Sequence, residues 1–194
     1  MSDQTNYASA LVQQPILYSQ RLRLRPFSLE DAPRVTELLQ TPEISDNTLN
    51  FPYPYEHHMA VTWIEGLRIN FESGLGFNSA IDLRDTGVLI GTIGLHISSR
   101  HSHAGIGYWL GRDYWNGGYM TEAASTLFEY AFEVLGLHRI YCDHFVRNPA
   151  SGRVMQKLGM TYEGTLRQHY RKGDGYEDVA TYGILRDEWL KRER

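Results

Sequence analysis

Two glycines, Gly117 and Gly118, stand directly before a helical pattern in the stretch YWNGGYMTEAA, which runs from Tyr114 to Ala124. The first N–H groups of a helix have no partner within the helix, and the helix dipole favours an anion beside them. Glycine lets the backbone approach such an anion closely because it has no Cβ atom. The stretch therefore fits a phosphate-binding turn, and a tight turn without a ligand remains the alternative.

Two other phosphate-binding motifs do not fit the sequence. The P-loop pattern GxxxxGK[ST] does not occur in it. The dinucleotide pattern GxGxxG fails by one residue, because Gly105 and Gly107 are followed by Leu110 where the third glycine is required. The turn at Gly118 is therefore the phosphate-binding candidate.

The elements around this turn alternate between strand and helix patterns. Period-two alternation in RLRLRPF predicts a strand over 21–27, and helical patterns follow Ser28 and cover roughly 57–72 and 118–135. A short helix begins after Asn148, a typical N-cap residue, with Pro149 at its first position. The segments FNSAIDL, VLIGTIGLHI, HAGIGYWL, HRIYCDHFV, MTYEGTLRQHY and YEDVATYGIL read as strands. Residues 41–58 are predicted as a loop.

Composition limits the class of protein and its partners. The chain has 194 residues, 42% of them hydrophobic and 22% charged, which is typical of a globular protein. A net charge of −4 argues against direct nucleic-acid binding. The single cysteine, Cys142, excludes an internal disulfide and fits a reducing compartment. With neither a signal peptide nor a membrane span in the sequence, we expect a cytoplasmic protein without a membrane partner.

No metal site is expected. The histidines of EHH (His57, His58) and of RHSH (His101, His103) have no spaced carboxylate or cysteine cluster beside them. Such a cluster is what the known ligand patterns of structural and catalytic metals require.

Four segments in a fixed order resemble the GNAT acetyltransferase superfamily, and within it the RimJ/RimL type, which acetylates the N-termini of ribosomal proteins. RLRLRPFSLEDA resembles that group's first strand and helix, and IGYWLGRDYWNGGYMTEAASTLFEYAF resembles its central strand, pyrophosphate turn and helix. LHRIYCDHFVRNPASGRVMQKLGM resembles the next strand and its N-x-x-S helix, and YEGTLRQHYRKGDGYEDVATYGILRDEW resembles its terminal hairpin. The resemblance covers nearly the whole chain.

The resemblance implies a fold and an activity. The fold is α/β, with a mixed, largely antiparallel sheet that is splayed at a central parallel strand pair and flanked by about four helices. A loose arm over 1–18 precedes a single acetyltransferase domain over 19–194. The implied activity moves an acetyl group from acetyl-CoA, without a metal, to a primary amine by direct attack in a ternary complex. We expect the amine to be the α-amine of a ribosomal or other protein N-terminus, and the chain to be a monomer or a homodimer.

The resemblance also assigns roles to residues. Glu163 is the implied base, acting directly or through water, and Ser151 lies near the cofactor's sulfur. Residues that would contact acetyl-CoA lie at the end of the central strand, in the turn and in the N-x-x-S motif: Leu110, Gly111, Trp115, Asn116, Gly117, Gly118, Tyr119, Met120, Thr121, Asn148 and Ser151. We place acceptor recognition in the aromatic loop, at Phe51, Tyr53 and Tyr55, and packing of these rings against the core is the alternative.

Two other functions remain open. Trp115 and Met120 depart from the family pattern of the turn, which has Gln or Arg at the first position and Gly or Ala at the last. This departure favours a CoA-binding module without catalysis. The second alternative is an acetyltransferase for a small amine such as a polyamine or an aminoglycoside.

Overall fold

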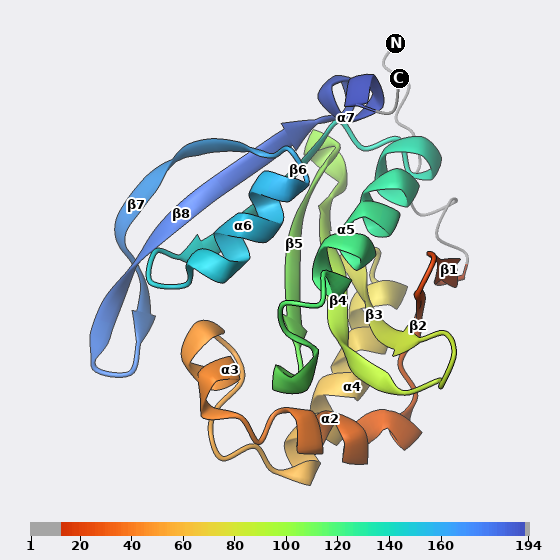
Figure 1. Cartoon of the computed structure of the whole chain (residues 1–194), viewed down its shortest axis with the longest axis vertical. Helices are drawn as coiled ribbons and strands as arrows, with labels where there is room; N and C mark the ends of the chain where they lie inside the picture. The colour runs from red at the N-terminus through yellow and green to blue at the C-terminus, as the bar shows by residue number, and fades with distance from the viewer. Residues whose placement is uncertain (1–12, 193–194) are drawn as a thin grey trace.

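The structure, a computed structural model, describes residues 13–192, which form one eight-stranded sheet with helices on both sides (Figure 1). The strands are β1 (Leu17–Tyr18), β2 (Leu22–Pro26), β3 (Gly76–Leu83), β4 (Leu89–Ser98), β5 (His103–Leu110), β6 (Arg139–Phe145), β7 (Thr161–Lys172) and β8 (Gly175–Leu185). The α-helices are α2 (Ala32–Leu38), α3 (Pro42–Asn47), α4 (His57–Glu72), α5 (Tyr119–Glu129), α6 (Pro149–Lys157) and α7 (Arg186–Arg192). Shorter turns of helix are η1 (Leu29–Asp31), η2 (Ser99–His101), η3 (Arg112–Tyr114) and the π-helical η4 (Tyr130–Val134).

The sheet is split into two halves at its centre. Its strand order is β1-β2-β3-β4-β5-β6-β8-β7, and every neighbouring pair is antiparallel except β5 with β6. β5 and β6 pair only at His103–Gly105 with Arg139–Tyr141, after which the two strands diverge (Figure 1). This confirms the predicted mixed sheet that is splayed at a central parallel pair.

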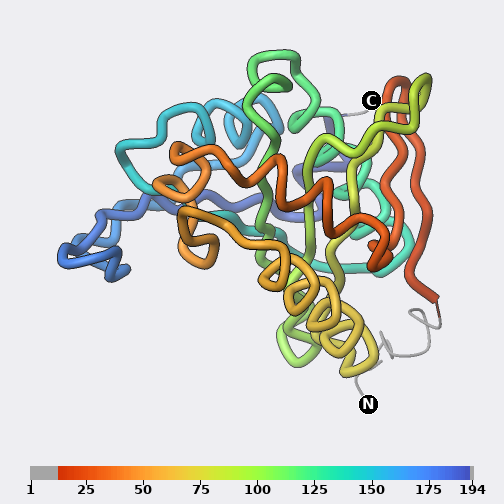
Figure 2. Tube along the Cα trace, turned by 90° about the horizontal axis from the view of Figure 1, so that it is seen from below, coloured from red at the N-terminus to blue at the C-terminus, as the bar shows by residue number. Residues whose placement is uncertain are grey.

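Each side of the sheet carries its own hydrophobic core. Along β5, Ala104 and Ile106 pack into a core with α5 and α6, whereas Trp109 packs into a second core with α2 and α4. This alternation follows from the two-residue period of a strand. Figure 2 shows α4 on the opposite side of the sheet from α6. The described helices include none that is long and apolar enough to cross a membrane.

The structure departs from the predicted elements at two helices and one strand. A helix, α3, lies within the predicted loop, and its signal is Pro42 at the first helical position, which the proline-rich surroundings obscure. A second helix, α7, ends the described chain. Leu17 and Tyr18 pair with β2, so the end of the predicted arm belongs to the sheet, and 1–12 lie outside the described residues.

A buried carboxylate joins β2 to β3. Asp82 is 0% exposed, and its Oδ2 atom accepts hydrogen bonds from Arg23 Nη2 at 2.6 Å and from Arg25 Nε at 2.7 Å. Arg25 also donates to Asp31 at 2.7 Å. Burial alone would raise the pKa of Asp31, but the hydrogen bonds that it accepts outweigh burial and lower it. Arg23 and Arg25 therefore have structural partners on the face of β2 opposite Leu22 and Leu24.

Candidate active site

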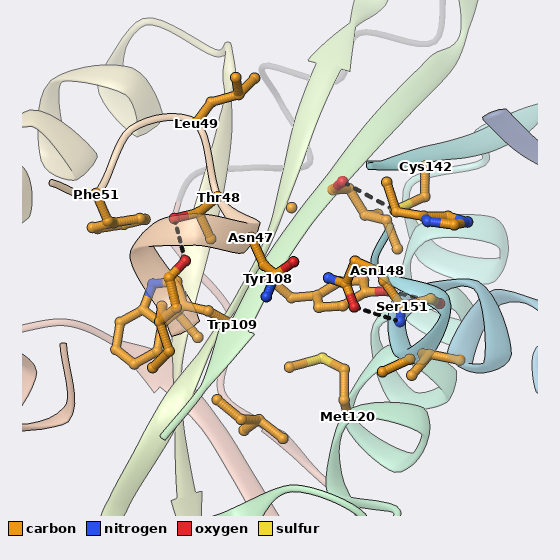
Figure 3. A pocket seen from close by; sticks show the side chains of 18 of the residues that line it. Asn47, Thr48, Leu49, Phe51, Tyr108, Trp109, Met120, Cys142, Asn148 and Ser151 are labelled. Carbon is orange, nitrogen blue, oxygen red and sulfur yellow. Dashed lines mark hydrogen bonds between the residues drawn. The ribbon is translucent and has the colours of Figure 1, made fainter. Parts of the chain in front are cut away.

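A cavity of about 760 Å³ lies where β5 and β6 diverge. Its walls come from the ends of these strands, the turn before α5, the start of α6 and the chain after α3 (Figure 3). Tyr108, Asn148 and Ser151 lie on one side in Figure 3, and Phe51, Thr48 and Trp109 lie on the other. Ligand pockets of proteins commonly have a volume of about 300–1,000 Å³.

The edge of β5 offers main-chain groups to the cavity. The N–H of Gly111 donates to the Ile90 carbonyl of β4 at 2.9 Å, so by alternation the N–H groups of Leu110 and Tyr108 point the other way. β6 pairs with β5 only as far as Gly105, so within residues 13–192 this stretch of edge has no strand partner. An extended ligand can therefore pair with the edge as an added strand does.

The turn before α5 has the backbone form that an anion site needs. Gly118 is the N-cap residue of α5 with φ +77°, a left-handed conformation that favours glycine, and no side chain caps the helix there. The N–H groups of the first turn of α5 are thus open to a ligand. Arg21 supports the turn from outside the cavity by donating to the Gly117 carbonyl at 3.0 Å. A Cβ atom at Gly117 would lie 2.7 Å from the Tyr119 ring, so a larger residue there would displace that ring, whereas the left-handed φ of Gly118 favours glycine itself.

Trp115 and Met120, the two unusual residues of the turn, have structural roles. The indole Nε1 of Trp115 donates to the Leu110 carbonyl at 2.8 Å, which ties the turn to the end of β5. Met120 is buried in the core beneath the cavity and lines the cavity at the same time (Figure 3). Neither contact removes the main-chain donors of the turn.

A pair of hydroxyl groups lies at the start of α6. Asn148 caps this helix by accepting from the Ser151 N–H at 3.4 Å, and the Ser151 hydroxyl lies 2.7 Å from the hydroxyl of Tyr108 (Figure 3). Burial raises the pKa of Tyr108 well above its ordinary value of 10.0, so the phenol is protonated at neutral pH. The pair can therefore donate a proton at this point of the cavity.

Tyr108 was not among the residues predicted from the sequence. The signal was present, because Tyr108 lies two residues before Leu110 and therefore projects from the same face of β5.

The structure does not bring Glu163 to the cavity. Glu163 lies on β7, and its two carboxylate oxygens accept from the two terminal nitrogens of Arg139. These hydrogen bonds and the charge of Arg139 lower the pKa of Glu163. Its side chain is absent from the cavity walls. Because its carboxylate is paired with a guanidinium and lies outside the cavity walls, this geometry argues against Glu163 as the base, a role that stays a prediction.

Only one of the three predicted acceptor residues lines the cavity. Phe51 does, with its ring 5.5 Å from that of Trp63 and 5.9 Å from that of Trp109. Tyr55 is 2% exposed and packs in the core behind Phe51, where burial raises its pKa to about 12. Tyr53 is 53% exposed and lies outside the cavity. Tyr55 therefore packs against the core, which was the alternative to acceptor recognition.

The predicted cofactor residues are largely brought together. Those that line the cavity are Leu110, Trp115, Asn116, Gly118, Tyr119, Met120, Thr121, Asn148 and Ser151. Gly111 and Gly117 lie beside it and shape the chain through main-chain contacts. Within the described residues, no cluster of three or more metal-ligating side chains occurs.

Two cations connect the β6–β8–β7 half of the sheet to the end of α3. Arg147, just after β6, donates to the Asp46 carbonyl and to Asn47 Oδ1, and Lys172 of β7 donates to the Thr48 carbonyl at 2.7 Å. Cations at a helix C-terminus are favoured by the helix dipole. These contacts fix the position of α3 and of the chain that follows it, called here the α3 segment. This segment covers the side of the cavity that Phe51 lines, which is the predicted acceptor side.

Comparisons with known proteins agree with this geometry. Residues 21–161 match the family described as acetyltransferase (GNAT) domain. An uncharacterized N-acetyltransferase of Bacillus subtilis, YoaA, is 34% identical over 178 residues, which cover 89% of this chain and 97% of that protein. The ribosomal-protein-serine acetyltransferase of Escherichia coli is 32% identical over 51% of this chain and 56% of its own length.

A solved structure gives the same fold. RimL, the ribosomal L7/L12 alpha-N-protein acetyltransferase in complex with coenzyme A, has a TM-score of 0.81 at 22% identity, covering 88% of this chain and 98% of that one. Because the family match spans most of the chain, and a relative 34% identical is covered over 97% of its length, this chain belongs to the GNAT acetyltransferase family and is an acyltransferase.

Proposed function

We propose that this protein transfers the acetyl group of acetyl-CoA to a primary amine, preferably the α-amine of a protein N-terminus, by direct attack in a ternary complex. The observation that carries the proposal is the Tyr108–Ser151 hydroxyl pair, 2.7 Å apart, where the open edge of β5 meets the start of α6. A proton donor at that point suits a thiolate leaving group.

The cavity has a place for each part of acetyl-CoA. The main-chain N–H groups between Trp115 and Thr121 suit the pyrophosphate, because Gly118 opens the N-terminus of α5. The edge of β5 suits the pantetheine arm, whose amides pair with strand main chain. Asn148, which already caps α6, has an amide group free to hydrogen-bond the same arm.

The chain's own groups then serve the reaction. The amine nitrogen attacks the thioester carbonyl, and the edge N–H of Leu110 stabilises the oxyanion. The carbon–sulfur bond breaks, and the sulfur takes the electron pair and a proton from the Tyr108–Ser151 pair. The new amide nitrogen loses its surplus proton to water, and the Tyr108–Ser151 pair regains a proton from water, so that transfer to the neutral amine releases no net proton.

An acetyl-cysteine intermediate is disfavoured by the position of Cys142. Its thiol is fully buried and donates to the Ile106 carbonyl, and burial raises its pKa far above the ordinary value. A thiol that stays protonated is a poor nucleophile. This supports direct transfer.

An α-amine is the preferred acceptor for two reasons. It has a pKa near ~8, whereas a lysine amine has one near ~10.4, so less free energy is needed to deprotonate it at neutral pH. In addition, the E. coli relative is named for a ribosomal protein serine. The alternative acceptor is a small amine, and the α3 segment held over the cavity by Arg147 and Lys172 is consistent with it.

We expect the purified protein to release CoA thiol when a serine-initiated peptide with a free α-amine and one internal lysine is added to acetyl-CoA. The same peptide with its α-amine blocked is the matched control, and it should react at least about 10-fold more slowly. Equal rates with the two peptides would place the reaction on the lysine. Faster release with a polyamine or an aminoglycoside would contradict the preference for a protein N-terminus.

A further inference from the structure

Asp143 lies on the cavity wall and has a different environment from the other acidic residues near it. It is in β6, next to Cys142, whose side chain packs in the core with α5 and α6. By the alternation of a strand, Asp143 projects to the opposite side, toward the acceptor half of the cavity.

The carboxylate of Asp143 has no partner among the described residues. Its Oδ1 atom is buried from solvent without a hydrogen bond, and neither oxygen takes part in a hydrogen bond or ion pair within 13–192. The other carboxylate of the cavity wall, Glu43, is paired with Arg112 at 2.9 Å. A carboxylate oxygen that is withdrawn from water and left unpaired costs free energy unless a cation or a donor reaches it.

The strand opposite Asp143 leaves room for such a group. The last residue pair of β5 and β6 is Gly105 with Tyr141. If this register is extended by two residues along each strand, Gly107 of β5 lies opposite Asp143 of β6. Gly107 has no side chain, and a Cβ atom placed there would meet only His96 Nε2, at 3.6 Å. The space between the two strands at this level is therefore open, one residue from Tyr108.

The charge of Asp143 affects the pKa of a neighbouring side chain, Tyr170. Burial raises the pKa of Tyr170, and the negative charge of Asp143 raises it further. The titratable and charged groups that line the cavity with Asp143 are Glu43, His96, Tyr108, Tyr114, Tyr119, Cys142, His144, Arg153, Lys157 and Tyr170. None of them forms a hydrogen bond or an ion pair with the carboxylate of Asp143 in the described part of the chain, although the Cys142 thiol donates to the Asp143 main-chain carbonyl, so the carboxylate is available to a ligand.

We infer that Asp143 binds the ammonium group of the acceptor and takes its proton, which makes it the catalytic base of the reaction proposed above, on which this inference rests. An N–H bond of the ammonium breaks and an O–H bond forms on Asp143. The freed lone pair of the nitrogen forms the new C–N bond. The C–S electron pair leaves on sulfur, which is protonated by the Tyr108–Ser151 pair. The nitrogen loses its second proton to water, and the Tyr108–Ser151 pair regains a proton from water. Asp143 then returns its own proton to water, so that one proton is released for each ammonium group acetylated.

The test compares Asp143→Asn with Glu163→Gln in the full-length protein. The substrates are acetyl-CoA and whichever of the amines named above, the peptide, the polyamine or the aminoglycoside, the wild type acetylates fastest. Asparagine keeps the shape of the side chain and loses its charge. We expect kcat/KM for the amine to fall by about 10²–10³-fold in Asp143→Asn, and the Kd for acetyl-CoA, measured by calorimetry, to stay unchanged. Glu163→Gln, which breaks only the pair with Arg139, should stay within about 2-fold of the wild type.

The pH dependence separates a base from a merely structural residue. The loss of kcat/KM in Asp143→Asn should become smaller as the pH rises toward the pKa of the amine, because more of the amine is then already deprotonated in solution. A wild-type kcat/KM in Asp143→Asn, or a deficit that is the same at every pH, would overturn the role of Asp143. Absence of transfer by the wild type to every amine would instead overturn the proposed function, and this inference with it.

Discussion

Removing the Ser151 hydroxyl is expected to lower kcat by about 10²-fold, because general acid catalysis typically contributes about 10²–10⁴-fold. In Ser151→Ala, the thiolate must leave without a proton from the Tyr108–Ser151 pair, whose oxygens lie 2.7 Å apart. The binding of acetyl-CoA should change little, because the turn and the β5 edge supply main-chain groups. Steady-state kinetics at saturating acetyl-CoA and amine, with calorimetry for acetyl-CoA, measure the two effects separately.

Tyr108→Phe provides the matched test of the pair. It keeps the ring and removes only the hydroxyl, so it should lose activity to a similar extent. Because the two hydroxyls act as one donor, the double variant should be little worse than either single one. A wild-type kcat in Ser151→Ala would contradict the proton-donor role, and so would a double variant whose loss is the product of the single losses. Unchanged melting temperatures would show that the variants are folded.

Replacing Asp82 by alanine is expected to lower the free energy of unfolding by about 3–5 kcal/mol, the cost of breaking a buried charge pair by removing one partner. Asp82 is 0% exposed and accepts from two arginines, so its loss leaves the half-buried Arg25 with only Asp31. Urea unfolding monitored by tryptophan fluorescence measures this loss.

Arg23→Ala is the control for this site. Arg23 is 40% exposed and binds the same carboxylate, so its removal should cost only about 0–1 kcal/mol, as is usual for exposed pairs. Asp82 would still be held by Arg25. A loss below about 1 kcal/mol in Asp82→Ala would contradict the structural role given to this network.

Much of the fold could be predicted from the sequence because its signals are local. The two-residue alternation of RLRLRPF places Leu22 and Leu24 in the core and Arg23 and Arg25 on the opposite face of β2. The cap of α6 follows from Asn148 and Pro149, and α5 begins after Gly118 as expected. Each of these features depends on neighbours within a few positions of the chain.

The features that were missed depend on pairing across the sheet. Glu163 meets Arg139 because β7 and β6 both pair with β8, and nothing within the YEG segment signals that partner. Asp143 was missed because its distinguishing feature is a buried carboxylate oxygen without a hydrogen bond among the described residues, and this can be seen only in the folded structure. For the same reason, the resemblance predicted the residues around the cofactor better than it predicted the base. The main-chain donors are a consequence of the local sequence of the turn, whereas the role of a carboxylate depends on the side chains that surround it in the fold.

The central claim is direct acetyl transfer from acetyl-CoA to an amine in the cavity between β5 and β6. Its most direct test is to incubate the protein with acetyl-CoA, with and without the free α-amine peptide, and to follow free thiol together with the masses of peptide and protein. We predict thiol release only with the amine, a peptide heavier by one acetyl group, and a protein of unchanged mass. Absence of thiol release with every amine tested, or a protein that itself gains the acetyl group, would contradict the account.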